Sequence, residues 1–122
     1  MTLRHTAVRV EDIERSVEFY EDLLGYEVVR SFESDGVRNV FVGHPDPEAV
    51  DEAAVQLVEA DGPVDPGDFV HVALTVDDVD GAVEKLDDEQ IDDGPLTMEE
   101  FDTRVAFVQA PEGWGLELIE DL

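Results

Sequence analysis

The sequence predicts an α+β fold built from two copies of one module, and three observations lead to this prediction. The segment HTAVRVEDIERSVEFY, which begins at His5, aligns without a gap to HVALTVDDVDGAVEKL, which begins at His71, at an offset of 66 residues. The same offset relates Phe41 to Phe107, and an offset of 61 relates the later segments AVQLVEA and GLELIED. Within each copy the hydrophobic pattern follows the order β-α-β-β-β. Such self-similarity is typical of a duplicated supersecondary unit.

Residues 1–60 form the first predicted module, with four strands and one helix. Alternating apolar residues bounded by turn residues predict strands over 3–10, 26–34, 37–42 and 54–59. Asp12 is the predicted N-cap of the helix, because apolar residues recur at helical spacing after it, and Gly25 ends that helix. Residues 61–68 are rich in Gly and Pro and form the predicted linker.

Residues 69–122 repeat the cycle as the second predicted module. Strands are expected over 69–76, 92–98, 104–109 and 114–120, and a helix over 79–90. One helix covers only one face of a four-stranded sheet, so the other face of each sheet needs a partner. Two curled mixed sheets of this kind would enclose a cleft, and 122 residues would then form one structural domain.

The charge excludes several classes of function. The chain carries 33 acidic residues against six arginines and Lys85, a formal net charge of −26, so phosphate backbones and anionic lipid surfaces are repelled. The acids are spread among periodic apolar residues, which favours adaptation to high salt over a disordered acidic tail, because the Debye length falls to about 3 Å in molar salt. No signal-peptide pattern opens the chain, and we expect a cytoplasmic protein from a high-salt organism.

Alternation along the strands places four metal-competent side chains on the face opposite the large aliphatic residues. These are His5, Gln56, His71 and Glu117. Two imidazoles, an amide oxygen and a carboxylate from equivalent positions of the two copies form a ligand set for a divalent ion, and the absence of Cys excludes a thiolate site. Phe41 and Phe107 are interpreted as core residues, and the acidic pair Asp77–Asp78 as solvated surface.

These residues resemble the vicinal-oxygen-chelate superfamily and, within it, glyoxalase I (lactoylglutathione lyase). The similar segments are those that begin at His5 and His71, together with VAFVQAPEGWGLELIE from Val105, so nearly the whole chain is covered. The resemblance implies paired βαβββ modules, the glyoxalase/bleomycin-resistance/dioxygenase fold, around a metal cleft. The resemblance implies that the bound ion is Ni²⁺ or Zn²⁺, with Mn²⁺, Co²⁺ and Fe²⁺ as alternatives. The ligands carried over by position are His5, Gln56, His71 and Glu117.

The resemblance also implies a reaction, the detoxification of methylglyoxal. A lyase of this type isomerises a methylglyoxal–thiol hemithioacetal to a 2-hydroxyacyl thioester through a metal-bound enediolate. Glu117 would act as the catalytic base that moves the proton between the two carbons. Arg9 shares a strand face with His5 and has Thr75 as its counterpart, so it is the expected partner of a substrate carboxylate. The chain is small and its predicted sheets would expose an edge, so we expect a homodimer.

Departures from the family pattern leave the substrate open. Gln56 stands where bacterial glyoxalases carry Glu, and Glu59–Ala60 stand where their glutathione-binding Asn is expected, so the thiol is not identified. One alternative is enolate chemistry like that of methylmalonyl-CoA epimerase, although residues 36–40 lack the second base. Another is a non-catalytic member that binds a small molecule. The triad of an iron extradiol dioxygenase is disfavoured, because Gln56 occupies a position that O₂ requires.

Overall fold

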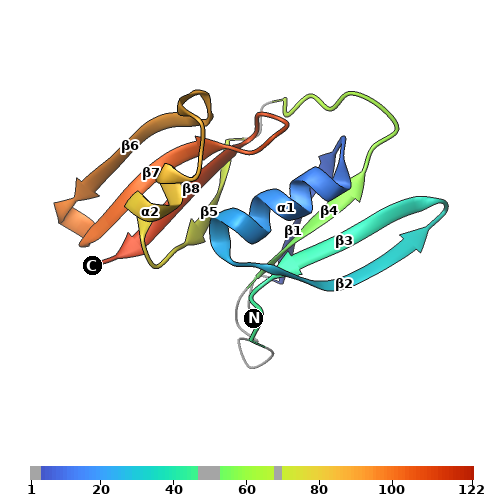
Figure 1. Ribbon diagram of the computed structural model, residues 1–122, viewed down its shortest axis with the longest axis horizontal. Helices are drawn as coiled ribbons and strands as arrows, with labels where there is room; N and C mark the ends of the chain where they lie inside the picture. Colours follow the sequence, from blue (N-terminus) through green and yellow to red (C-terminus); the bar gives the residue numbers. More distant parts are fainter. Residues whose placement is uncertain (1–3, 47–52, 68–69) are drawn as a thin grey trace. The chain divides into compact units, whose positions relative to one another are not determined.

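A computed structural model describes residues 4–46, 53–67 and 70–122 of the protein. The chain divides into two compact units, Met1–Val64 and Asp65–Leu122, and the boundary falls within the segment predicted as a linker. Each unit contains one four-stranded mixed sheet and one α-helix in the order β-α-β-β-β (Figure 1). The α+β fold of two repeated modules is therefore confirmed.

The first unit is a mixed sheet with one helix against it. Its elements are β1 (His5–Val10), α1 (Ile13–Leu24), β2 (Glu27–Ser34), β3 (Val37–Gly43) and β4 (Ala54–Glu59). The strand order is β1-β4-β3-β2, in which β1 pairs parallel with β4 and the other pairs are antiparallel. The predicted strands agree to within about a residue, except that Leu3 lies outside the described residues.

The second unit repeats this arrangement. Its elements are β5 (His71–Thr75), α2 (Val79–Glu84), β6 (Ile91–Met98), β7 (Thr103–Gln109) and β8 (Gly115–Asp121), with short 3-10 helices at Asp88–Gln90 and Glu99–Phe101. The strand order is β5-β8-β7-β6, again with one parallel pair, β5 with β8. Phe69, predicted to open the first strand, lies outside the described residues.

Both helices begin at an aspartate cap. The Asp12 carboxylate accepts a hydrogen bond of 3.1 Å from the Arg15 backbone N–H, and Asp78 accepts one of 3.1 Å from the Gly81 N–H. These bonds satisfy backbone donors that have no partner inside the helix. Gly25 ends α1 in the left-handed region at φ 68°, as predicted, because a residue without Cβ adopts that conformation at little cost.

The predicted helix over 79–90 is wrong in its length, because α2 ends at Glu84. Gly81 lowers the helix propensity of this segment. Glu84 and Asp88 would also be one turn apart in a continued helix, where like charges repel. The chain instead starts a separate 3-10 turn, in which the Asp87 N–H donates to the Gln90 side chain over 3.1 Å.

Each unit buries one face of its sheet under its helix. In the first unit the buried side chains include Val10, Ile13, Tyr20, Val42, Val55 and Leu57. In the second they include Val79, Ala82, Ala106, Val108, Leu116 and Leu118. The opposite face of each sheet carries the polar residues discussed below. Within the described ranges, no helix has the length and apolarity needed to cross a bilayer.

Candidate metal centre

In the first unit, His5 and Gln56 lie on the sheet face that α1 does not cover. Strand register fixes this placement, because Gln56 pairs with Ala7 on one side and with Phe41 on the other. The His5 ring meets the Phe41 ring edge-on, with centroids 5.2 Å apart and planes at 88°. An aromatic contact of this geometry restricts the orientation of the imidazole.

A chain of amide hydrogen bonds holds Gln56. Its Nε2 donates to Oδ1 of Asn39 over 2.9 Å, and Nδ2 of Asn39 donates to the Val37 carbonyl over 3.1 Å. Asn39 is only 7% exposed, whereas Gln56 is partly exposed. The amide nitrogen of Gln56 is thus engaged within the sheet, and its carbonyl oxygen stays available as a ligand.

In the second unit, His71 and Glu117 are in direct contact. Nε2 of His71 lies 3.1 Å from Oε2 of Glu117, and the two side chains are 34% and 21% exposed. Glu117 pairs with Ala73 and with Phe107 in the sheet, and the Phe107 ring centroid lies 6.0 Å from that of His71. The strand register of His, Phe and oxygen ligand is therefore the same in both units, while the ring centroids lie 5.2 Å apart in the first and 6.0 Å apart in the second.

The interpretation of Phe41 and Phe107 as core residues is wrong. Both are partly exposed and pack against the predicted histidine ligands, on the face opposite the helix. The signal was present in the sequence, because the strand alternation that places Gln56 and Glu117 on this face places the paired Phe residues there too.

The donor chemistry of both units fits a divalent metal ion. Each unit presents one imidazole and one side-chain oxygen on a single sheet face, and all four side chains keep some access to solvent. Imidazole and carboxylate or amide oxygen are ligands that Ni²⁺ and Zn²⁺ accept. Each unit by itself would provide half of a four-ligand set.

Two arginines lie on the same face of the first sheet. Arg9 is exposed on β1, four residues beyond His5, so their Cα atoms are roughly 13 Å apart along the strand. Arg30 on β2 was not singled out from the sequence, and its guanidinium lies 5.4 Å from the Phe32 ring centroid and 5.7 Å from that of Phe41. Cation–π contact holds Arg30 over the aromatic pair beside His5. A register shift in β2 at this point obscures its face from sequence alternation.

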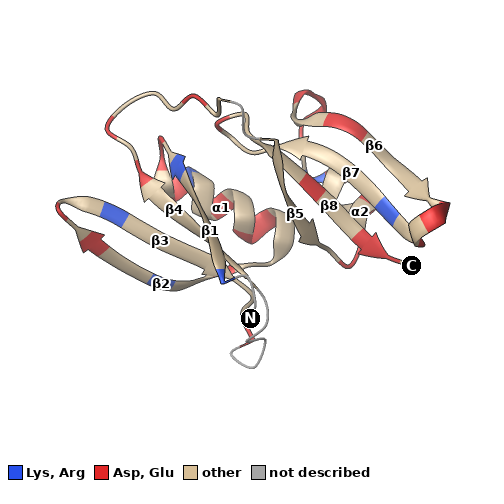
Figure 2. Cartoon of the chain, turned by 180° about the vertical axis from the view of Figure 1, so that it is seen from behind, with Lys and Arg blue, Asp and Glu red and all other residues tan. Residues whose placement is uncertain are grey.

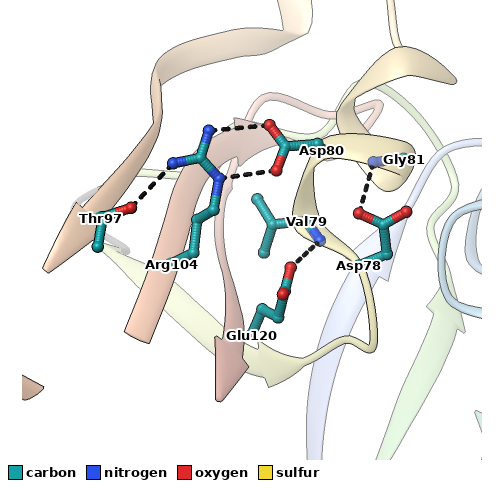
Figure 3. A network of polar contacts seen from close by, with 7 residues as sticks. All are labelled: Asp78, Val79, Asp80, Gly81, Thr97, Arg104 and Glu120. Atoms are coloured by element: carbon teal, nitrogen blue, oxygen red, sulfur yellow. Dashed lines mark hydrogen bonds and ion pairs between the residues drawn. The ribbon is translucent and has the colours of Figure 1, made fainter. Parts of the chain in front are cut away.

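A second group of carboxylates, Asp78, Asp80 and Glu120, also has ligand atoms close together. Each of these carboxylates already has a structural partner (Figure 3). Asp78 caps α2, Glu120 accepts the Val79 N–H over 2.9 Å, and Asp80 accepts two bonds of 2.7 and 2.9 Å from Arg104. The hydrogen bond from Arg104 lowers the pKa of Asp80, and the same bond raises the pKa of Arg104. This group fastens α2 to its sheet.

The first unit contains the counterpart of this fastening. Nη1 of Arg38 lies 2.6 Å from Oε1 of Glu14 in α1 and 3.7 Å from Oε2 of Glu59. The hydrogen bond from Arg38 lowers the pKa of Glu14. Because both units use equivalent residues in this way, the acidic group is part of the duplicated architecture.

A groove of about 610 Å³ in the first unit lies between α1 and the β2–β3 hairpin. Ile13 and Val17 of the helix and Val28 and Phe32 of the hairpin line it, with Arg38 and Glu14 at its polar side. The candidate ligands His5 and Gln56 are not among its lining residues. Asn39, which accepts the hydrogen bond from Gln56, does line the groove, so the groove reaches the residues beside this half-site.

Residues 2–118 match the Glyoxalase/Bleomycin resistance protein/Dioxygenase superfamily. The chain is 35% identical to the lactoylglutathione lyase of Escherichia coli O157:H7, over 99% of its own length and 93% of that protein. It is 33% identical to the probable lactoylglutathione lyase of Synechocystis, over 98% of its own length and 95% of the relative.

The chain is also similar to solved structures of glyoxalase I. The trypanothione-dependent glyoxalase I of Leishmania major is 26% identical with a TM-score of 0.75, and the match covers 99% of this chain and 87% of that one. A glyoxalase I variant from Zea mays is 25% identical with a TM-score of 0.75, and this chain spans 45% of its length.

Proposed function

Because the chain belongs to the glyoxalase/bleomycin resistance protein/dioxygenase superfamily, we propose that it is a metal-dependent lyase of the glyoxalase I type. Its reaction would convert a methylglyoxal–thiol hemithioacetal to a 2-hydroxyacyl thioester. The observation that carries the proposal is the contact of 3.1 Å between His71 and Glu117, on the same sheet face and in the same register as the His5–Phe41–Gln56 group of the first module. Relatives named lactoylglutathione lyase at 30–35% identity support the class of reaction.

In this proposal His5, Gln56, His71 and Glu117 hold the ion. The chemistry that a divalent ion supplies when bound there is Lewis-acid stabilisation of the negative charge that develops on two adjacent substrate oxygens. Glu117 removes the proton from the carbon that carries the sulfur and the hydroxyl group, and returns it to the neighbouring carbonyl carbon. The hydroxyl proton passes to the second oxygen, so that the product is a thioester with an adjacent hydroxyl group.

Arg9 and Arg30 would bind the thiol part of the substrate. Both lie on the sheet face of His5, in a molecule of net charge −26, so they are the cations available there for an anionic group. Relatives differ in this part of the substrate, since one is named for glutathione and another for trypanothione. The thiol used by this chain is therefore best found by direct comparison of several thiols.

We also propose the salt conditions, the compartment and the oligomeric state in which the enzyme works. Asp and Glu occur in both units (Figure 2), which supports a protein of a high-salt organism, and we expect it in the cytoplasm. We expect a homodimer, with residues 1–60 and 69–122 as the two modules of each chain and 61–68 as their linker.

The test is metal content and turnover of protein purified in molar KCl. We expect about one Ni²⁺ or Zn²⁺ per site by mass spectrometry of the metal, and turnover of methylglyoxal with at least one of glutathione, trypanothione and smaller thiols. Glu117→Gln should lower kcat by roughly 10²–10⁴-fold, the range attributed to a general base. Glu120→Gln is the matched control on the same strand, because a Gln side chain still accepts the Val79 N–H, and it should retain activity.

Each negative outcome has a defined meaning. Bound metal without turnover of any adduct would reject the lyase assignment and direct the next assay to epimerisation of an acyl-CoA. Absence of metal under all conditions would reject the four-ligand site and favour a binding protein of the same superfamily.

A further inference from the structure

The first half-site contains a buried amide, that of Asn39, which has no counterpart in the second. Asn39 is 7% exposed and lies on β3 beside Gln56, on the same sheet face. The equivalent position in the second module, 66 residues later, is Val105, which is 4% exposed and makes no side-chain hydrogen bond. The oxygen ligand beside the amide is Gln56, and the one beside the valine is Glu117.

The hydrogen-bond chain determines which way the Gln56 amide points. The Val37 carbonyl can only accept, so the group of Asn39 that faces it must be Nδ2, at 3.1 Å. Oδ1 of Asn39 then faces Gln56 and can only accept, so Gln56 must present Nε2 to it, at 2.9 Å. The remaining atom of the Gln56 amide, Oε1, is turned away from Asn39. A backbone carbonyl therefore sets the orientation of the ligand through two side chains.

A carboxylate needs no such support. The two oxygens of Glu117 are equivalent, so either can bind a cation whichever way the group is turned. A glutamine has one oxygen that binds a cation and one NH₂ group that does not, so half of its orientations are unproductive. The polar neighbour is found in the module with the amide, and the apolar neighbour in the module with the carboxylate.

We propose that Asn39 is a positioning residue that holds Oε1 of Gln56 in the orientation for metal binding. The inference rests on the metal site of the proposed function and assigns to this site a supporting residue outside the ligand set. Such supporting hydrogen bonds restrict the ligand before the metal arrives, and their loss typically weakens metal affinity by about 10–100-fold.

The same geometry predicts that Asn39 weakens metal binding, instead of strengthening it, when residue 56 is a glutamate. With Gln56→Glu, Oδ1 of Asn39 would face a carboxylate, and two acceptors repel. Asn39 would then have to turn its amide and give up the bond to the Val37 carbonyl. Asn39 should therefore support a glutamine ligand and oppose a glutamate ligand, which a purely structural residue would not do.

The experiment is a double-mutant cycle on Ni²⁺ affinity, measured by calorimetry on the full chain in molar KCl. Four proteins are compared: wild type, Asn39→Val, Gln56→Glu and the double variant. Asn39→Val reproduces the side chain of the second module, and it should weaken Ni²⁺ binding by about 10-fold or more in the wild-type background. In the Gln56→Glu background the same substitution should leave binding unchanged or strengthen it. Val37→Ala is the control on the same strand, because it keeps the backbone carbonyl, and it should not change the affinity.

Two results would overturn the inference, and they are distinguishable. If wild type binds Ni²⁺ and Asn39→Val weakens it equally in both backgrounds, the effect comes from a general loosening of β3, and the positioning role is rejected while the metal site stands. If wild type binds neither Ni²⁺ nor Zn²⁺ while its circular dichroism shows a folded protein, the metal site is rejected and the positioning role with it. Thermal midpoints of all variants, recorded without metal, separate loss of folding from loss of affinity.

Discussion

The two modules fasten their helices in the same way and differ in the side chains around the candidate site. In the first, α1 runs for 12 residues and Glu14 pairs with Arg38; in the second, α2 runs for six residues and Asp80 pairs with Arg104. Both pairs are related by the offset of 66 residues. The shared contacts are those that a βαβββ unit needs in order to hold one helix against its sheet.

The differences are concentrated on the open sheet faces. On this face the first module carries Arg9 and Arg30 and a neutral ligand in Gln56. The second carries Thr75 in place of Arg9 and a carboxylate ligand in Glu117. We interpret this as a division of tasks after duplication, in which the first module binds the substrate and the second moves the proton.

The strongest test exchanges the oxygen ligands of the two modules. Starting from Glu117→Gln, which should lower turnover by roughly 10²–10⁴-fold, the substitutions Gln56→Glu and Asn39→Val place a carboxylate and its apolar neighbour in the first module. Because the half-sites have the same register, we expect at least about a tenfold recovery of kcat over the single variant. Steady-state kinetics with the preferred thiol adduct provides the measurement.

If the exchanged protein binds metal and shows no recovery, the two oxygen ligands are not interchangeable, and the second module alone can support proton transfer. Metal content of each variant must be measured in parallel, so that loss of the ion is not mistaken for loss of the base.

The next test concerns salt, because the modules differ in charge. Residues 1–64 carry 15 acidic and five basic residues, and residues 65–122 carry 18 acidic and two basic residues. Screening of this repulsion should raise the thermal midpoint by roughly 5–10 °C between 0.2 and 3 M KCl, and hydrogen exchange should show the second module opening first at low salt. Replacing Glu89, Glu99 and Glu100 with Gln, all exposed in the second module, should reduce this dependence.

A midpoint that does not change with KCl would contradict the high-salt interpretation. Equal protection of both modules at low salt would contradict only the difference between them.

Substitution of the phenylalanines beside the histidines should reduce Ni²⁺ affinity by a smaller amount. Phe41→Leu removes the edge-on contact that restricts His5, and an aromatic pair of this kind is worth about 0.5–1.5 kcal/mol, so Ni²⁺ affinity should fall roughly 2- to 12-fold. Phe107→Leu should have less effect, because His71 is also held by Glu117. Calorimetric titration with Ni²⁺ shows which of the two variants loses more affinity. A larger loss of affinity for Phe107→Leu would contradict this prediction.

The smallest effect is expected for the ion pairs that hold each helix against its sheet. Their loss should lower the thermal midpoint by an amount that depends on pH. The hydrogen bond from Arg104 lowers the pKa of Asp80, so the pair stabilises the folded state above the ordinary pKa of about 3.9, and this stabilisation is lost as pH falls through the lower value in the folded protein. Asp80→Asn should lower the thermal midpoint by no more than a few degrees near pH 7, because the pair is exposed, and by less below pH 4.

Glu14→Gln in the first module provides the comparison, and it should have the weaker effect, since Arg38 makes one short contact where Arg104 makes two bonds to Asp80. A fall in midpoint that is the same at every pH would show that the Asp80 carboxylate does not stabilise the fold through its charge.

The sequence by itself determined the duplication, the order of the elements and the face of each sheet on which His5, Gln56, His71 and Glu117 lie. These properties are local or periodic: alternation along a strand fixes its two faces, and Asp12 and Gly25 act on neighbouring backbone groups. The constant offset between the copies then relates each residue to its counterpart.

Tertiary structure decided which side chains meet across strands that are distant in the sequence. The orientation of Gln56 by Asn39, the Arg30 contact with Phe41 and the Arg104–Asp80 pair all depend on strand register and helix placement, which alternation leaves open. The placement of α2 also depends on tertiary contacts, because Glu120 accepts the Val79 N–H and Arg104 binds Asp80.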